Sequence, residues 1–177
     1  MLCLSEYASP IGKITLATDG KAITALWLAG QSPEKEFAGT PLCKSDPPVI
    51  KEAKRWLDIY FSGMEPDFVP VLAPSGTPFQ TEVWNLLRKI PYGETTTYGA
   101  LAAEVAKRRG KEKMSAQAVG NAVGSNPISI IVPCHRVVGA NGNLTGYNGG
   151  IKYKTALLKL EGGWSPAFFV PKKSSRL

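Results

Sequence analysis

The chain of 177 residues carries a formal net charge of +7, and its apolar content of 44% is ordinary for a globular protein. No apolar run is long enough to span a membrane, and the first residues lack the features of a signal peptide, so we expect a cytoplasmic protein without membrane contact. Its three cysteines are odd in number and widely spaced, so we expect no disulfide framework and a reducing, intracellular location. Its single histidine has no second one nearby, so we expect no metal site.

The first third of the chain predicts a small antiparallel sheet. Its expected strands cover residues 2–7, 11–18 and 22–28. Asp19-Gly20 is a strong hairpin-turn signal, because both residues accept positive φ. Apolar residues between 49 and 60 then recur at helical spacing and predict one amphipathic helix. Four prolines within 66–78 indicate a linker, so we place a first domain at residues 1–76.

The second half of the chain predicts helices. They are expected from Thr77 to about Ile90 and at about 98–108, 116–124 and 152–160. Thr77-Pro78-Phe79-Gln80 is a capping box with proline at the first helical position, and Ser115 can cap the third helix. Two short helices joined by a turn are typical of a helix-turn-helix. We place a second domain at 77–165 and a basic tail at 166–177.

The positive charge belongs to the second half of the chain. Residues 1–76 hold 7 Lys/Arg against 9 Asp/Glu, whereas residues 77–177 hold 14 against 5. This imbalance favours nucleic acid as a partner of the second half, because neutralised phosphates release counterions. Residues 107–113 hold six charges, which favours a solvated loop over a phosphate clamp. Two glycines in the helix 116–124 fit either tight helix packing or entry into a DNA groove.

A cysteine next to the only histidine is the main chemical signal. Pro133-Cys134-His135-Arg136 follows the apolar run 128–132, which we predict as a buried strand. A thiolate is a strong nucleophile, although a free cysteine can also be an inert core residue. Neighbours on a strand face opposite ways, so either the chain bends after Pro133 or the histidine acts through a water. Glu161 is the only acid after residue 112 and could orient the imidazole, or it could be a solvated charge at a helix end.

The segment from Asn126 to Val138 resembles the active-site segment of the O6-alkylguanine-DNA alkyltransferases, also called methylated-DNA–protein-cysteine methyltransferases. Further matches in the family's order are Pro91-Tyr92-Gly93-Glu94, Thr97-Tyr98, Ala118-Val119-Gly120, Thr145-Gly146-Tyr147-Asn148-Gly149-Gly150, Lys154, Leu157, Leu158, Glu161 and Gly162. The match is good from Thr77 to Gly163, whereas the N-terminal part agrees only in length and coarse pattern.

The resemblance implies an α/β N-terminal lobe like ribonuclease H, followed by a mostly α-helical C-terminal lobe with a winged helix-turn-helix. It implies a monomer that binds double-stranded DNA in the minor groove with little sequence preference, without metal or cofactor. The damaged base would be flipped into a pocket, because a thiolate cannot reach O6 inside the stack. The O6-alkyl group of guanine, and the O4-alkyl group of thymine, would pass to Cys134. The thioether product is inert, so each molecule would act once.

The resemblance also implies roles for single residues. Cys134 would accept the alkyl group, His135 would act as a base through water, Glu161 would orient His135, Asn126 would brace the cysteine segment, and Tyr98 would hydrogen-bond the leaving guanine. The carbonyls of Cys134 and Val137 would read the exocyclic amine of guanine. The implied contacts to DNA or the flipped base are Thr97, Ser115, Gln117, Ala118, Arg136, Val137, Tyr147, Asn148 and Gly149.

The chain departs from the family's pattern at two places. The family usually carries an arginine that fills the space left by the flipped base, and Gln117 stands there instead. The loop 107–113 is longer and more basic than usual, and the zinc site of some members is not expected because residues 1–76 hold no histidine.

Three other functions can be weighed against the same residues. An alkyltransferase-like damage sensor would lack Cys134, and a Cys-His hydrolase or acyltransferase would not need the basic second half. A winged-helix transcription factor would leave the Cys-His pair unexplained.

Overall fold

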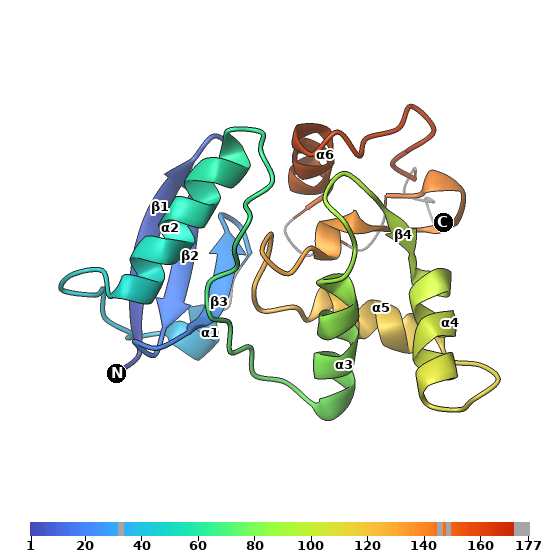
Figure 1. Ribbon diagram of the computed structural model, residues 1–177, viewed down its shortest axis with the longest axis horizontal. Helices are drawn as coiled ribbons and strands as arrows, with labels where there is room; N and C mark the ends of the chain where they lie inside the picture. The colour runs from blue at the N-terminus through green and yellow to red at the C-terminus, as the bar shows by residue number, and fades with distance from the viewer. Residues whose placement is uncertain (32–33, 145–146, 148–149, 172–177) are drawn as a thin grey trace, which may run out of the picture.

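The computed structural model describes residues 1–31, 34–144, 147 and 150–171. The chain forms two lobes joined by an extended linker (Figure 1). In chain order the elements are β1 (Cys3–Ser9), β2 (Gly12–Thr18), β3 (Ile23–Leu28), α1 (Glu34–Phe37), α2 (Pro48–Phe61), α3 (Pro78–Leu87), β4 (Thr96–Thr97), α4 (Tyr98–Arg108), α5 (Ala116–Gly124), the 3₁₀ helix η1 (Cys134–Arg136), β5 (Val137–Val138), the 3₁₀ helix η2 (Ala140–Gly142) and α6 (Ile151–Leu160). Within the described residues, no helix is long and apolar enough to cross a membrane.

The N-terminal lobe is an antiparallel sheet in the order β1-β2-β3, with α2 lying across it (Figure 1). The Asp19 carboxylate closes the β2–β3 turn by accepting the N–H groups of Lys21 and Ala22, each at 2.8 Å. Leu16 on β2 pairs with Leu26 on β3, and both side chains are fully buried in the cluster that also receives the apolar face of α2. Burial of such a side chain stabilises the fold by about 1.5–3 kcal/mol. The predicted sheet and helix are confirmed.

The C-terminal lobe is mostly helical, as predicted. Both halves of the capping box at α3 are present: Thr77 Oγ1 accepts the Gln80 N–H at 3.1 Å, and Gln80 Oε1 accepts the Thr77 N–H at 2.9 Å. The indole of Trp84 on α3 donates to the carbonyl of Ala122 on α5 at 2.8 Å, which fixes these two helices against each other. β4 and β5 pair in parallel and link the start of α4 to the segment after the cysteine.

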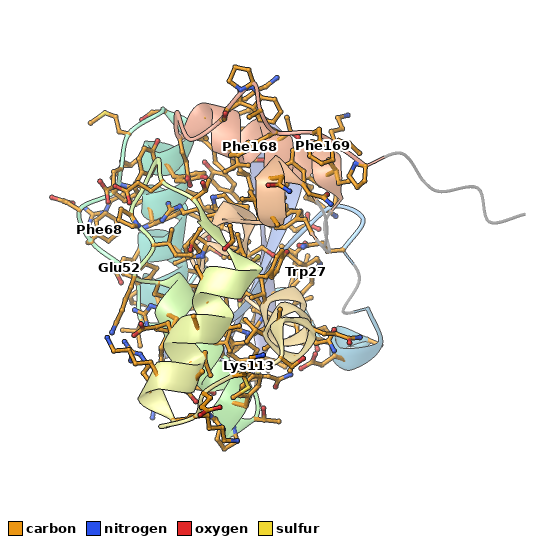
Figure 2. The ribbon with its side chains drawn as sticks, turned by 90° about the vertical axis from the view of Figure 1, so that its right-hand side faces the viewer. Trp27, Glu52, Phe68, Lys113, Phe168 and Phe169 are labelled. Atoms are coloured by element: carbon orange, nitrogen blue, oxygen red, sulfur yellow. A yellow bond between two sulfur atoms is a disulfide. The ribbon has the colours of Figure 1, made fainter. Side chains whose placement is uncertain are left out.

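The expected tail begins later than predicted. Phe168 packs with Leu158 and Leu144, and the N–H and carbonyl of Phe169 bond to Gly142 and Leu144 at 3.0 and 2.9 Å. Figure 2 shows both phenylalanines at the upper end of the molecule, with Lys113 of the basic loop at the lower end. Residues 166–171 therefore belong to the C-terminal lobe, whereas the rest of the expected tail, 172–177, lies outside the described residues.

The outer edge of β3 joins the two lobes. Leu26 donates its N–H to the Pro127 carbonyl at 2.9 Å and accepts the Ser129 N–H at 3.0 Å. Farther along the same edge, the Ile23 N–H donates to the Val71 carbonyl at 2.8 Å. An open sheet edge would leave these groups unpaired, so the edge is satisfied by the linker and by the segment that leads to the cysteine. The N-terminal lobe is thus hydrogen-bonded directly to the segment that precedes Cys134.

The apolar run 128–132 is not the predicted strand. Only Ile128 makes a strand-like bridge, and the residues after it form a tight turn in which Ile130 has φ +70°, a left-handed conformation that is unfavourable for a β-branched residue. Asn126 supplies the missing partners: Nδ2 donates to the carbonyls of Val132 (2.8 Å) and Ile128 (3.2 Å), and Oδ1 accepts the Ile128 N–H at 3.0 Å. The run is apolar because both lobes bury it, which periodicity cannot distinguish from a buried strand.

The expectation that no disulfide forms was also wrong. Cys3 on β1 is bonded to Cys43, 40 residues later. Beside it, Leu4 donates its N–H to the Pro41 carbonyl at 2.9 Å and accepts the Cys43 N–H at 2.8 Å. This pairing lays residues 41–43 along the edge of β1, where the two sulfurs meet. The odd cysteine count misled because one thiol, Cys134, is free while the other two pair.

Removing this disulfide should lower the free energy of unfolding by about 4 kcal/mol, the loop-closure entropy of a loop of this length. Urea unfolding of a Cys3→Ser/Cys43→Ser variant measures the change, and reduction of the unmodified protein should reproduce it while leaving the variant unaffected. The surroundings of Cys134 should stay unchanged, because β1 is the sheet edge away from the second lobe. Equal stability of the variant and the unmodified protein would mean that the hydrogen bonds alone hold this edge.

Candidate active site

The thiol of Cys134 lies in a closed position. Cys134 opens η1, its N–H donates to the Val132 carbonyl at 2.9 Å, and only 8% of the residue is exposed. The predicted opposition of neighbouring side chains does not apply, because the chain bends into a 3₁₀ turn after Pro133. A cavity of about 10 Å³ adjoins the sulfur, and its lining includes Gln31, Asn126, Ser129 and Tyr147. That space suits a single water molecule.

A buried cation faces the cysteine. Burial raises the pKa of the Cys134 thiol, and a hydrogen bond from Asn126 and the charge of Lys154 act against this rise. Lys154 is fully buried on α6 and donates from Nζ to the Val137 carbonyl. Burial lowers the pKa of Lys154 to about 8, against the opposing effect of a charged Cys134. A thiolate formed here would therefore have a cationic partner, which lowers the cost of its charge.

Lys154 is one of the residues that match the family's pattern in the sequence, but the sequence does not indicate its role. A signal was available, because Leu157 and Leu158 are one turn further on the same helix face and place the lysine among core positions.

His135 and Glu161 form a buried pair behind the thiol. His135 Nε2 is 2.7 Å from Glu161 Oε1, and neither side chain is exposed. Burial alone would raise the pKa of Glu161, but the hydrogen bonds from His135 and Arg136 and the positive charge of Arg136 outweigh it and lower the pKa to about 2. Burial, supported by the charges of Arg136 and Lys154, lowers the pKa of His135 despite the opposite effect of Glu161. The pair at neutral pH is therefore a carboxylate beside a neutral imidazole.

This charge state decides which nitrogen of His135 can act as a base. An ionised carboxylate can only accept, so Nε2 carries the proton and donates it to Glu161, and Nδ1 keeps a lone pair. Nδ1 is buried and has no hydrogen-bond partner among the described residues. The imidazole is thus fixed on one side and free to accept a proton on the other, as in other nucleophile–histidine–acid arrangements.

Arg136 and Tyr60 complete the surroundings of Glu161. Arg136 donates from Nε to Glu161 Oε2 and from Nη2 to Oε1, both at 2.9 Å, and from Nη1 to the Ile90 carbonyl at 2.7 Å. The guanidinium group therefore points into the protein interior and makes these bonds, instead of the DNA contact expected from the sequence. The hydroxyl of Tyr60, on α2 of the other lobe, donates to Glu161 Oε1 at 2.7 Å. The sequence placed Tyr60 only on the apolar face of its helix.

Tyr98 and the glycine-containing helix lie together near the thiol. Tyr98 opens α4, and a Cβ on Gly120 of α5 would stand 3.7 Å from its ring. An added methyl group at Gly120 would therefore make an ordinary van der Waals contact with Tyr98, and Gly124 has no neighbour this close among the described residues. Burial, with a smaller effect of a charged Cys134, raises the pKa of Tyr98 to about 12. Tyr98 therefore stays protonated at neutral pH and can donate a hydrogen bond.

The expected DNA contacts lie at the starts of α4 and α5. Thr97 and Ser115 are helix caps whose hydroxyl oxygens accept the N–H groups of Ala100 (3.0 Å) and Ala118 (3.1 Å). Gln117 is exposed in the first turn of α5. Such helix starts carry donor N–H groups that suit phosphates.

The expected base-binding groups are only partly described. The two carbonyls expected to contact guanine already accept one hydrogen bond each. The Cys134 carbonyl accepts the N–H of Val137, and the Val137 carbonyl accepts Nζ of Lys154. Tyr147 is buried beside the cysteine, and Asn148 and Gly149 lie outside the described residues.

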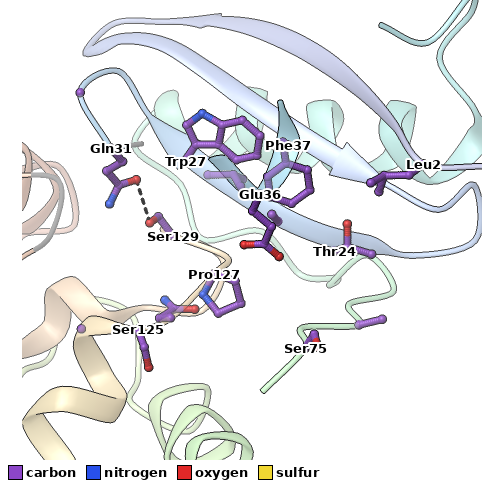
Figure 3. A pocket seen from close by; sticks show the side chains of 16 residues that line it. Leu2, Thr24, Trp27, Gln31, Glu36, Phe37, Ser75, Ser125, Pro127 and Ser129 are labelled. Atoms are coloured by element: carbon purple, nitrogen blue, oxygen red, sulfur yellow. Dashed lines mark hydrogen bonds between the residues drawn. The ribbon is translucent and has the colours of Figure 1, made fainter. Parts of the chain in front are cut away.

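A larger cavity of about 440 Å³ lies between β3 and the turn before the cysteine (Figure 3). The stacked rings of Trp27 and Phe37, 5.1 Å apart, line it on one side. Ser129 donates to Gln31 Oε1 at 3.1 Å, and these two residues border both this cavity and the small one at the thiol. Cys134 does not line the larger cavity. Among the described residues, no group of three or more His, Cys, Asp or Glu could hold a metal ion.

Comparison with known proteins covers both lobes. Residues 3–71 match the family model of the 6-O-methylguanine DNA methyltransferase ribonuclease-like domain, and residues 78–163 match that of the 6-O-methylguanine DNA methyltransferase DNA binding domain. The chain is 47% identical, over 88% of its length and 96% of the relative, to a methylated-DNA–protein-cysteine methyltransferase of Methanosarcina acetivorans. A Mycobacterium tuberculosis protein of the same name is 46% identical over 90% of this chain and 92% of the relative.

Solved structures agree with the sequence relatives. The crystal structure of the Mycobacterium tuberculosis O6-methylguanine methyltransferase has a TM-score of 0.77 at 45% identity, over 94% of this chain and 96% of that one. The structure of the Mycobacterium tuberculosis protein in complex with DNA also has a TM-score of 0.77, at 44% identity over 90% and 92% of the two chains.

Proposed function

The chain belongs to the 6-O-methylguanine DNA methyltransferase family, and from this premise we propose that Cys134 is the acceptor of the alkyl group, in a reaction that each molecule performs once. Its activity is the repair of DNA by direct transfer of the O6-alkyl group of guanine to a protein cysteine. One observation carries the choice of residue: of the three cysteines, two are joined, and the free one directly precedes the buried His135–Glu161 pair.

The proposed reaction begins with a proton transfer. Nδ1 of His135, which has no hydrogen-bond partner among the described residues, takes the thiol proton of Cys134 through a water molecule. Glu161 stabilises the imidazolium, and Lys154 stabilises the thiolate. The sulfur then attacks the alkyl carbon, the bond from carbon to O6 breaks, and its electron pair stays on guanine. Tyr98 donates a hydrogen bond to guanine as that negative charge develops, and the S–C bond is not hydrolysed.

We propose that the damaged base leaves the DNA stack before it reacts. The cavity at Cys134 has room for about one water, so a guanine must displace the side chains around it. In this proposal α4 and α5 form a winged helix-turn-helix, α5 enters the minor groove of duplex DNA with little sequence preference, and Gln117 fills the space of the flipped base. The same pocket would take O4-alkylthymine.

The remaining expectations are proposals about organisation and location. We propose two domains, with the linker dividing them near residue 76, in a protein that acts as a monomer. The disulfide removes the argument from cysteine usage for a cytoplasmic location, so that proposal now rests on the DNA substrate alone.

Replacing Gln117, the proposed plug that fills the space of the flipped base, should separate the effect on base flipping from the effect on alkyl transfer. Gln117→Ala should slow repair of O6-methylguanine in duplex DNA on the order of tenfold or more, because part of the unstacking cost of a few kcal/mol returns to the barrier. The reaction with free O6-benzylguanine should stay unchanged, since a free base needs no flipping. Single-turnover rates on the two substrates measure the difference.

Asn121→Ala is a matched control, because Asn121 is also exposed on α5 but lies one turn beyond Gln117. It should leave the rate with free O6-benzylguanine unchanged and should slow duplex repair much less than Gln117→Ala does. Equal slowing of both substrates by Gln117→Ala would assign Gln117 to the shape of the thiol site and would remove the plug from the proposal.

A further inference from the structure

One hydrogen bond at the buried acid comes from the other lobe. Tyr60 lies near the end of α2, 101 residues before Glu161, and its hydroxyl donates to Glu161 Oε1 at 2.7 Å. Both residues are at most 6% exposed. The ring is held independently of this bond by its own helix, stacked on Trp56 at 5.1 Å and edge-on to Phe61 at 5.3 Å. The position of the hydroxyl is therefore set by the N-terminal lobe.

The direction of this bond follows from the charge on Glu161. The carboxylate is ionised, so Tyr60 can only donate to it. Oε1 then accepts from three groups, the hydroxyl of Tyr60, Nε2 of His135 and Nη2 of Arg136, while Oε2 accepts from Nε of Arg136. Each donor draws part of the negative charge toward itself. Tyr60 thus controls how much of that charge remains for His135.

We infer that Tyr60 is a positioning residue for alkyl transfer, supplied by the N-terminal lobe, which fixes the Glu161 carboxylate toward His135. The inference rests on the proposed function, because it acts through the pair that would deprotonate Cys134. It gives the N-terminal lobe a part in the chemistry besides the support of the reactive turn by Leu26.

Loss of the hydroxyl should change the pH dependence in a definite direction. The titratable and charged groups that face the pair are Tyr60 on α2, Tyr92 before β4, Arg136 in η1 and Tyr147, with Lys154 of α6 acting on His135. Without the Tyr60 donor, more of the negative charge of Glu161 acts on the imidazole and favours its protonated form. The pKa of His135 rises, so Nδ1 loses its lone pair at a higher pH than in the unmodified protein.

The test is Tyr60→Phe, which keeps the ring and removes the oxygen. With free O6-benzylguanine, the rate of alkylation should fall about tenfold, as expected when a hydrogen bond to a charged group is lost at a reacting site. The acid limb of the pH–rate profile should move to higher pH. The final amplitude should remain one alkyl group per molecule. In a protein that reacts once, amplitude counts folded molecules and rate reports the chemistry, so partial misfolding cannot imitate the result.

Tyr7→Phe is the matched control. Tyr7 donates to the carboxylate of Asp58 at 2.7 Å, also on α2, but this pair lies within the N-terminal lobe. It should leave the rate and the pH profile unchanged. A Tyr60→Phe protein with the rate and acid limb of the unmodified protein would overturn the inference while the proposed function stands. An unmodified protein that takes up no alkyl group at Cys134 would overturn the proposed function instead.

Discussion

Cys134→Ser should abolish alkyl transfer while DNA binding persists. A serine hydroxyl cannot form a comparable nucleophile beside His135 and Lys154, because its proton is held far more tightly than that of a thiol. The starts of α4 and α5, which we propose as the DNA contacts, are untouched by the change, so affinity for DNA should stay within a small factor of the unmodified protein. Loss of binding together with loss of transfer would indicate a folding defect and would call for Cys134→Ala as a second variant.

Mass spectrometry tests this prediction most directly. After incubation with DNA that contains O6-methylguanine, the intact mass should rise by one methylene, and the addition should map to the peptide with Cys134. The Cys3→Ser/Cys43→Ser protein should show the same addition, because those thiols are bonded to each other. DNA with O4-methylthymine tests the wider substrate range in the same way. Label on Cys3 or Cys43, or repair of many lesions by one molecule, would contradict the proposed reaction.

Glu161→Gln should remove most of the activity and much of the stability. The carboxylate accepts four N–H or O–H donors, and an amide would direct its own NH₂ group at some of them. His135 would lose the partner that selects its tautomer, which in a comparable triad costs on the order of 10⁴ in rate. Arg136 would remain as a buried charge without its counterion, a change that costs about 3–5 kcal/mol. Single-turnover rates and urea unfolding measure the two effects.

The difference in unfolding free energy between the unmodified protein and Glu161→Gln should depend on pH. Folding lowers the pKa of Glu161 from 4.5 to about 2, so its ionised form stabilises the fold above about pH 4.5, and this stabilisation is lost as pH falls toward 2. The shift corresponds to about 3 kcal/mol. The unfolding free energies of the unmodified protein and Glu161→Gln should therefore converge as pH falls from 4.5 toward 2.

Glu82→Gln serves as the matched control, because Glu82 pairs with Arg109 at 2.7 Å in a partly exposed position. Its loss should cost less than about 1 kcal/mol. Parallel pH curves for the unmodified protein and Glu161→Gln would show that Glu161 is not the group that titrates.

Local elements of this fold could be predicted because their causes lie within a few residues. The capping box from Thr77 to Gln80, the cap at Ser115 and the Asp19-Gly20 turn all join groups two or three residues apart. Helix spacing likewise needs only one face of one segment. The run 128–132 could not be predicted in this way, because its turn depends on Asn126 filling the hydrogen bonds that a strand partner would have filled.

The sequence by itself determined the helices α2 to α6, the order of the two lobes and the family. It also indicated the residue types of the reacting group, because Cys134 and His135 are adjacent in the chain. Only the tertiary structure decided which distant groups meet them. Tyr60 reaches Glu161 across 101 residues, and Cys3 finds Cys43 across 40. Arg136 turns inward to Glu161. These contacts depend on how the two lobes pack and on the cost of leaving buried polar groups unpaired. The residue pattern of one segment does not indicate which distant segment it contacts.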